Sequence, residues 1–155
     1  MGLDMYLTAE RFVSGYDSTK DENFSKILDL LKIDAADVER SMTVGVTVGY
    51  WRKANAIHNW FVQNVQDGED DCRRTHVPTD MLEALRDECV DALAAYNSGD
   101  KIEAENIISP TSGFFFGSTE IDEGYKIDLE QTIKILDKCL SDKFKDYDFH
   151  YQASW

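Results

Sequence analysis

The chain has few cysteines, few prolines and no long apolar run. Its 155 residues include three cysteines and two prolines. The cysteines, Cys72, Cys89 and Cys139, match neither a disulfide framework nor a CxxC pair, so we expect reduced thiols. No apolar run approaches the roughly 18 residues that a membrane helix needs, which predicts a protein without a membrane partner.

Basic residues are also scarce. Lysine and arginine number 16 against 30 aspartates and glutamates, which leaves a net charge of −14. Such a surface repels nucleic-acid phosphates, and because no basic patch stands out we expect no duplex nucleic-acid partner. Two interpretations of the acidity stay open: it keeps the protein soluble, or it mimics phosphate charge on a surface that occupies another protein.

Signatures of catalysis, metal binding and cofactor binding are missing. The chain contains no Walker loop and no GxGxxG, HExxH or GxSxG motif. Cys72 and His76 form a lone CxxxH, and His58 as a third ligand would still be weak evidence for zinc. The carboxylates Asp122 and Glu123 are predicted to be cap and turn residues. We therefore predict no catalytic residues, no metal and no cofactor, and we favour a binding protein over an enzyme.

The composition is that of a folded protein. With 43% hydrophobic and 12% aromatic residues, the chain can form one domain over residues 1–155 that buries roughly 70% of its unfolded surface. Apolar residues alternate over Leu3–Val13 and 42–50, more weakly over 72–77, and again over 149–155, which predicts strands. The N-terminus lacks the features of a signal peptide, so we expect a cytoplasmic location.

Helical spacing fills the regions between these strands. The pattern predicts helices over residues 23–32, 51–66, 79–96 and 128–140, with a short helical piece at 102–107. Thr79 and Asp128 are the predicted N-caps of the third and fourth of these helices. We therefore predict an α+β fold, with a mainly antiparallel sheet of about four strands and three or four helices packed on it. Glycines in the second strand are expected to let a helix approach the sheet.

The stretch Tyr50–Phe61, with the sequence YWRKANAIHNWF, carries the candidate site. It lies where the second strand gives way to a helix, whose free N–H groups attract anions. Two cations, a stacking tryptophan and hydrogen-bonding amides beside them predict a pocket for a nucleotide-like anionic molecule. The candidates are Trp51, Arg52, Lys53, Asn55, His58 and Asn59. The alternative is that these residues only hold the corner together around a buried stripe of Ala54, Ile57 and Phe61.

Two further segments are candidates for the same site. Three consecutive phenylalanines cannot all face one side of an extended loop, so we expect Phe115 and Phe116 to form a pocket wall or a subunit contact in a homo-oligomer. Asp4 and Tyr6 would join the site if the first strand neighbours the second. Replacement of Arg52 or Asn55 by alanine is then expected to abolish ligand capture while changing the melting temperature little.

Four landmarks together resemble a family of small proteins from tailed phages and bacterial genomes. They are the opening MGLDMYL, the central YWRKANAIHNWFV, the FFFGS loop and the terminal YQASW. The resemblance is near full length but implies no established activity. It implies a context, because accessory phage genes often interfere with host defence or metabolism.

The residues and this context together lead to three hypotheses. The first is a phage-type protein in the host cytoplasm that captures a nucleotide-like ligand, such as a defence signal, without turnover. The alternatives are an acidic, phosphate-mimicking inhibitor of a host protein and a small-molecule hydrolase.

Overall fold

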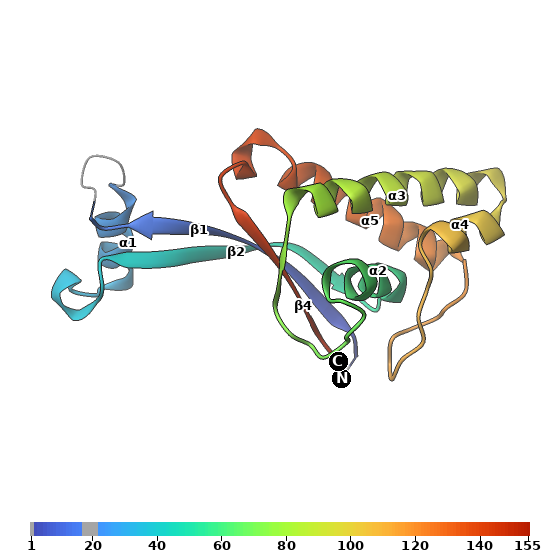
Figure 1. The fold of residues 1–155 in the computed structure, drawn as a ribbon, viewed down its shortest axis with the longest axis horizontal. Helices are drawn as coiled ribbons and strands as arrows, with labels where there is room; N and C mark the ends of the chain where they lie inside the picture. The colour runs from blue at the N-terminus through green and yellow to red at the C-terminus, as the bar shows by residue number, and fades with distance from the viewer. Residues whose placement is uncertain (1, 17–21) are drawn as a thin grey trace. The chain divides into compact units, whose positions relative to one another are not determined.

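The computed structural model describes residues 2–16 and 22–155, and the predicted α+β class is confirmed. Four antiparallel strands form one sheet in the order β2-β1-β4-β3 (Figure 1). The strands are β1 (Asp4–Ser14), β2 (Ser41–Arg52), β3 (Thr75–Val77) and β4 (Asp148–Ser154). The short β3 lies at the sheet edge and pairs antiparallel with β4 so that His76 faces His150.

Five helices accompany this sheet in the described part of the chain. They are α1 (Asn23–Leu31), α2 (Asn55–Val65), α3 (Thr79–Ser98), α4 (Lys101–Ile107) and α5 (Glu123–Cys139). Single 3₁₀ turns occur at Ala35–Asp37 and Asp142–Phe144. Each predicted helical segment therefore contains an observed helix.

The described residues form two compact units. The larger comprises residues 2–9 and 47–155, and the smaller comprises residues 10–16 and 22–46. Both β1 and β2 contribute residues to each unit. A single domain over residues 1–155 therefore stays a prediction.

The smaller unit has a small core of its own. Val13 on β1 packs with Phe24 and Leu28 of α1, and these are its buried hydrophobic residues. Met42 and Val44 on β2 cover this cluster in part. The helix then ends in a left-handed residue at Lys32, and the N–H groups of Lys32 and Ile33 donate to the carbonyls of Asp29 and Leu28.

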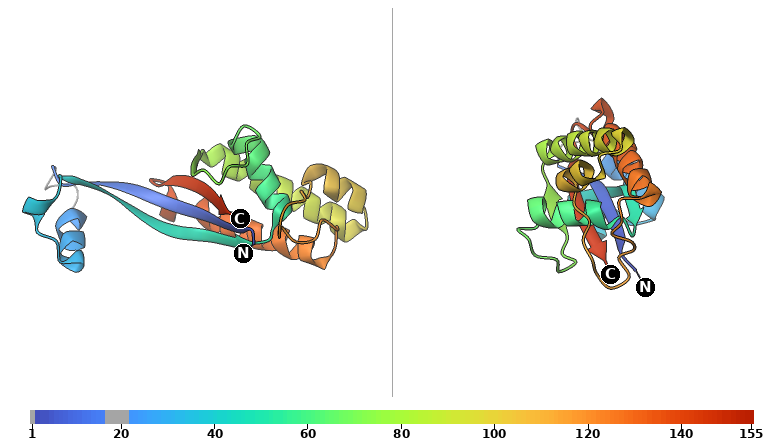
Figure 2. Two further views of the ribbon diagram at one scale, coloured as in Figure 1. Left: turned by 90° about the horizontal axis from the view of Figure 1, so that it is seen from below. Right: turned by 90° about the vertical axis from the view of Figure 1, so that its right-hand side faces the viewer.

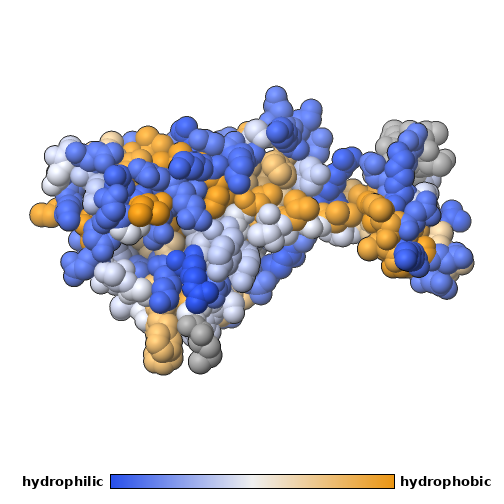
Figure 3. Space-filling view, turned by 180° about the vertical axis from the view of Figure 1, so that it is seen from behind, coloured by the Kyte–Doolittle hydropathy of each residue, from blue (hydrophilic) through white to orange (hydrophobic). Residues whose placement is uncertain are grey.

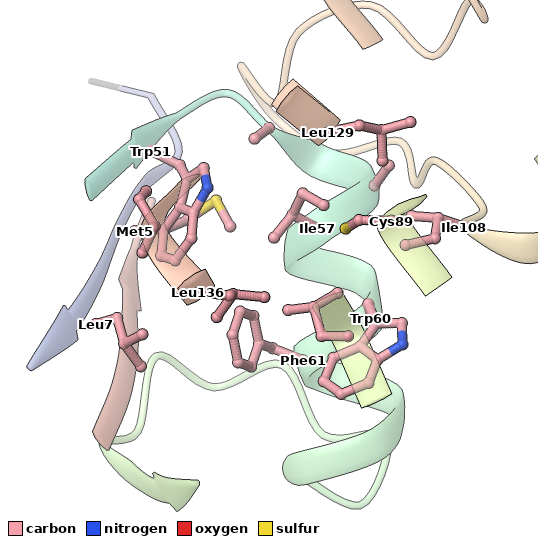
Figure 4. Close-up of a cluster of buried hydrophobic side chains, with 14 of the residues drawn as sticks. Met5, Leu7, Trp51, Ile57, Trp60, Phe61, Cys89, Ile108, Leu129 and Leu136 are labelled. Carbon is pink, nitrogen blue, oxygen red and sulfur yellow. The ribbon is translucent and has the colours of Figure 1, made fainter. Parts of the chain in front are cut away.

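In the larger unit the core lies between the sheet and helices α2, α3 and α5 (Figures 2 and 4). Alternation that starts just before β1, at Leu3, and continues along the strand buries Leu3, Met5 and Leu7, as predicted from the period of two. The predicted stripe on the second helical segment is also confirmed, since Ala54, Ile57 and Phe61 are fully buried. The Phe61 ring stacks on Tyr151 of β4, with centroids 3.9 Å apart.

A glycine in β2 lets helix α5 approach the sheet. A Cβ on Gly49 would lie 2.7 Å from Cγ2 of Ile135 on α5, closer than real side chains pack. The expectation that a helix packs against the glycine face of this strand is therefore confirmed at Gly49.

The structure corrects three predicted helix starts. Trp51 is still part of β2, and α2 begins at Asn55, because Lys53 adopts a left-handed φ of 61° that ends the strand. Helix α3 has Pro78 rather than Thr79 at its N-cap. The predicted N-cap at Asp128 is wrong as well, because α5 already begins at Glu123.

The true cap of α5 is Asp122, which the sequence predicted as a cap or turn residue. Its carboxylate accepts a hydrogen bond of 3.1 Å from the N–H of Tyr125. This bond satisfies one of the free donors of the first helical turn.

Within residues 2–16 and 22–155, the structure contains no helix that is long and apolar enough to cross a membrane.

Candidate functional site

A cavity of about 300 Å³ opens at the corner where β2 ends and α2 begins. One part of its wall comes from that corner, and the other comes from the loop before α5 and the first turns of α5. Its lining residues include Arg52, Lys53, Asn55, Ala56, Pro110, Gly117, Ser118, Glu120, Asp122, Tyr125, Ile127 and Asp128. A volume of this order suits a small molecule.

The corner is held in a defined shape by the backbone. Lys53 takes its left-handed conformation while its N–H donates to the carbonyl of Leu3, 2.8 Å away. Ala54 then serves as N-cap of α2, and no side chain of the described chain caps this helix end. The first turn of α2 therefore lines the cavity at Ala56. No cap side chain accepts a hydrogen bond from the N–H groups of this turn.

Two cations lie at this corner. Arg52 is partly engaged, since its Nη1 lies 3.5 Å from Oδ1 of Asp4 on β1. Lys53 forms no ion pair within the described ranges, and the loop at Gly117 packs against its side chain, since a Cβ there would lie 3.2 Å from Lys53 Cβ. The neighbouring strands thus bring Asp4 to Arg52, as expected if β1 lies next to β2, although Asp4 does not line the cavity.

Carboxylates line the other part of the wall. Glu120 and Asp122 come from the loop before α5, and Asp128 comes from the second turn of the helix. Burial and, to a smaller extent, the nearby Asp122 together raise the pKa of the Asp128 carboxyl to about 7. The cavity is therefore dipolar, with cations from the β2–α2 corner and carboxylates from the start of α5.

Asn55 binds the loop that carries Phe115 and Phe116 to this corner. Its side chain is 4% exposed, and its Nδ2 donates to the carbonyls of Ser118 at 2.8 Å and Phe116 at 3.2 Å. Its Oδ1 accepts from the N–H of Thr111 at 3.2 Å. Both ends of the amide are thus used to shape the cavity wall.

His58 lies in a buried network outside the cavity lining. Its Nδ1 is 2.7 Å from the hydroxyl of Tyr151, and its Nε2 is 3.0 Å from Oδ2 of Asp70. The other oxygen of Asp70 accepts a hydrogen bond from the indole N–H of Trp155. The histidine therefore joins α2 to β4 and to the end of the chain.

The remaining predicted site residues are also placed outside the cavity lining. Trp51 is buried in the core (Figure 4), and its Nε1 donates to Thr132 Oγ1 at 2.9 Å. Phe116 is buried against His58 with its ring edge-on. Phe115 is 52% exposed, and Asn59 donates to the carbonyl of Ser109. Arg52, Lys53 and Asn55 are the predicted residues that the cavity brings together.

Sequence reasoning missed the acidic and apolar parts of the wall. Glu120, Asp128, Pro110 and Ile127 are more than fifty residues away from Arg52 in the chain, and no local pattern connects them. Asp128 was noticed in the sequence, but as the predicted N-cap of a helix and not as a residue of the site. At the CxxxH, as elsewhere in the described ranges, no three His, Cys, Asp or Glu side chains gather as a metal site would require.

Protein-family profiles, curated protein sequences and solved structures were all compared with the chain, and none of them matches it.

Proposed function

We propose that this protein binds a small, anionic, nucleotide-like molecule in the cavity at the β2–α2 corner and holds it without turnover. The observation that carries the proposal is that Arg52, Lys53 and the uncapped first turn of α2 share one cavity of about 300 Å³. Cationic side chains and free helix N–H groups are the donors that phosphate groups use in proteins.

The net charge of −14 does not oppose this binding. Charged groups separated by more than about 8–10 Å are largely screened at physiological salt, so most surface carboxylates act only weakly on an anion bound at Arg52 and Lys53. The carboxylates that line the cavity lie on the other part of its wall. Pro110 and Ile127 give the cavity apolar surface against which a planar ring can pack.

The lining residues include neither cysteine nor histidine, and the hydroxyl of Tyr125 is engaged by the carbonyls of Ala104 and Ile108 at 2.8 and 2.9 Å. A hydrolase at this cavity would therefore have to use its carboxylates. In the phage context that the sequence resemblance implies, a captured nucleotide would be a host signal withdrawn from its receptor.

Calorimetric titration with mononucleotides tests the proposal. The double variant Arg52→Ala, Lys53→Ala should bind at least about tenfold more weakly than the unmodified protein, because each charge-assisted contact contributes about 1.5–3 kcal/mol. Lys143→Ala, Lys145→Ala is the matched control, since it removes the same charge at exposed positions elsewhere.

The recovered ligand decides between capture and reaction. After heat denaturation, chromatography should return the nucleotide unchanged. An altered nucleotide would favour the hydrolase alternative, and equal affinities of the cavity variant and its control would contradict the proposal.

A further inference from the structure

We propose that the ligand carries adjacent N–H donors at the end opposite its anionic group, that Asp128 accepts hydrogen bonds from them, and that a guanine mononucleotide has this chemistry. This inference rests on the proposed function, because it assigns the second half of the same cavity.

Asp128 is a partly buried carboxylate that the fold itself does not use. The hydrogen bonds and ion pairs found among the described residues leave both of its carboxylate oxygens without a donor, whereas its backbone carbonyl accepts from Thr132. Taking an ionised carboxylate partly out of water is costly to the fold. A carboxylate kept at this cost on a cavity wall is explained if a ligand supplies the missing donors.

The charges that face Asp128 do not neutralise it. Asp122 precedes the helix, caps it through the N–H of Tyr125, and repels a second negative charge. Glu120 in the same loop is also acidic. On the other part of the wall, Arg52 is already directed to Asp4. Burial and Asp122 both raise the Asp128 pKa, so the carboxylate lacks a compensating cation.

This arrangement selects a ligand by its hydrogen-bonding pattern. An ionised carboxylate accepts two parallel hydrogen bonds and donates none. Guanine presents two adjacent donors, the ring N1–H and the exocyclic amino group, whereas hypoxanthine keeps only the first. Xanthine has an acceptor oxygen in place of the amino group. With its phosphate bound at Arg52 and Lys53, the nucleotide would extend its base toward the part of the wall that contains Asp128.

Three mononucleotides that differ only at this edge of the base test the inference. At pH 8, calorimetry should show GMP binding about tenfold more tightly than IMP, because one hydrogen bond to a charged group is lost. XMP should bind most weakly, since its oxygen faces the carboxylate. This series uses the unmodified protein, so it stays decisive even if a variant fails to fold.

Asp128→Asn should invert the preference. The amide offers one acceptor and one donor, which fits the N1–H and the oxygen of xanthine. The variant should therefore bind XMP more tightly than GMP, while Asp91→Asn, at an exposed position on α3, keeps the original order. A variant that only lost structure would weaken all three ligands together.

The pH dependence gives an independent readout. The ratio of GMP to IMP affinity should rise as pH increases from 6 to 8, because the ionised form of Asp128 accepts both bonds. Taking the ratio cancels the phosphate ionisation that the two nucleotides share.

Failure of this inference differs from failure of the proposed function. Equal GMP and IMP affinities that still depend on Arg52 and Lys53 would overturn the role of Asp128 alone. Affinities that do not depend on those two cations would overturn both proposals.

Discussion

At the scale of single residues, Asp128 couples folding to pH. Its pKa in the folded chain is about 7, well above that of an ordinary aspartate. The folded protein therefore holds more protons than the unfolded chain between about pH 4 and about pH 7, and stability falls as pH rises through this window.

Asp128→Asn should remove this loss of stability. We expect the variant to be more stable than the unmodified protein by roughly 1–3 kcal/mol at pH 8, after allowance for the partial exposure of the group, and equal to it near pH 4. Urea unfolding at the two pH values measures the difference. If the stability difference between the variant and the unmodified protein were the same at pH 8 and at pH 4, ionised Asp128 would not destabilise the folded state.

Asn55 and Arg52 were expected to behave alike on replacement, and the structure separates them. Asn55→Ala removes three hydrogen bonds from a buried position, so it should cost about 2–3 kcal/mol of unfolding free energy rather than leave the melting temperature unchanged. Arg52→Ala, at a more exposed site, should cost little.

Denaturant unfolding compares these two variants. Asn59→Ala, which loses a single hydrogen bond to Ser109, is the matched control for Asn55 and should cost about 1 kcal/mol. Equal stabilities of Asn55→Ala and Asn59→Ala would argue that Asn55 does not hold the loop.

At the scale of elements, the packing of α5 on β2 depends on Gly49. Gly49→Ala should destabilise the protein by about 1–3 kcal/mol, because the added methyl would meet Ile135 at 2.7 Å. Ile135→Ala removes the nearest atom and leaves Cη2 of Trp51 at 3.0 Å, so the double variant should recover part of the loss and be more stable than the sum of the single effects predicts. Additive effects in this double-mutant cycle would mean that the two positions do not touch.

The network around His58 joins α2 to β4. Tyr151→Phe takes away the hydroxyl 2.7 Å from Nδ1 of this fully buried ring and leaves the nitrogen without a partner, which should cost about 1–3 kcal/mol. Tyr16→Phe, at an exposed tyrosine, should change nothing measurable. Guanidinium unfolding checks both, and a Tyr151→Phe protein of unchanged stability would contradict the network.

The elements themselves could be predicted where one periodicity dominates. Alternation in β1 and the apolar stripe of α2 were enough to predict both. Helix starts were harder to predict, because Asp122 and Asp128 are equally good caps in the sequence, and only the position of α5 on the sheet decides between them. The left-handed Lys53 that ends β2 gave no signal, since lysine carries no preference for that conformation.

The candidate site was predictable only in its local half. Arg52, Lys53 and Asn55 are neighbours in the chain, so their type and spacing indicated a cationic corner. The carboxylate wall depends on a loop more than fifty residues away, which Asn55 fastens to the corner. Contacts of this kind follow from tertiary packing and leave no local pattern.

At the scale of the whole molecule, the two units differ in how much apolar surface they bury. The smaller unit buries Val13, Phe24 and Leu28, while Leu30 on α1 remains 82% exposed. Figure 3 shows hydrophobic side chains on the surface of this unit. So small a core contributes little local stability.

Hydrogen exchange should reveal this difference. Amides of α1 are expected to exchange much faster than those of α3 and α5, whose inner faces belong to the main core. Mass spectrometry of exchanged peptides checks this, and equal protection of α1 and α5 would contradict it.

If a ligand occupies the cavity at the β2–α2 corner, as we propose, the amides that border the cavity should sense its binding. Titration of isotopically labelled protein with GMP, followed by amide chemical shifts, measures this. We predict saturable shifts at Lys53, Ala56, Gly117 and Gly124, which border the cavity, and their loss in the Arg52→Ala, Lys53→Ala variant. Shifts that gather elsewhere, or none at millimolar GMP, would contradict the claim.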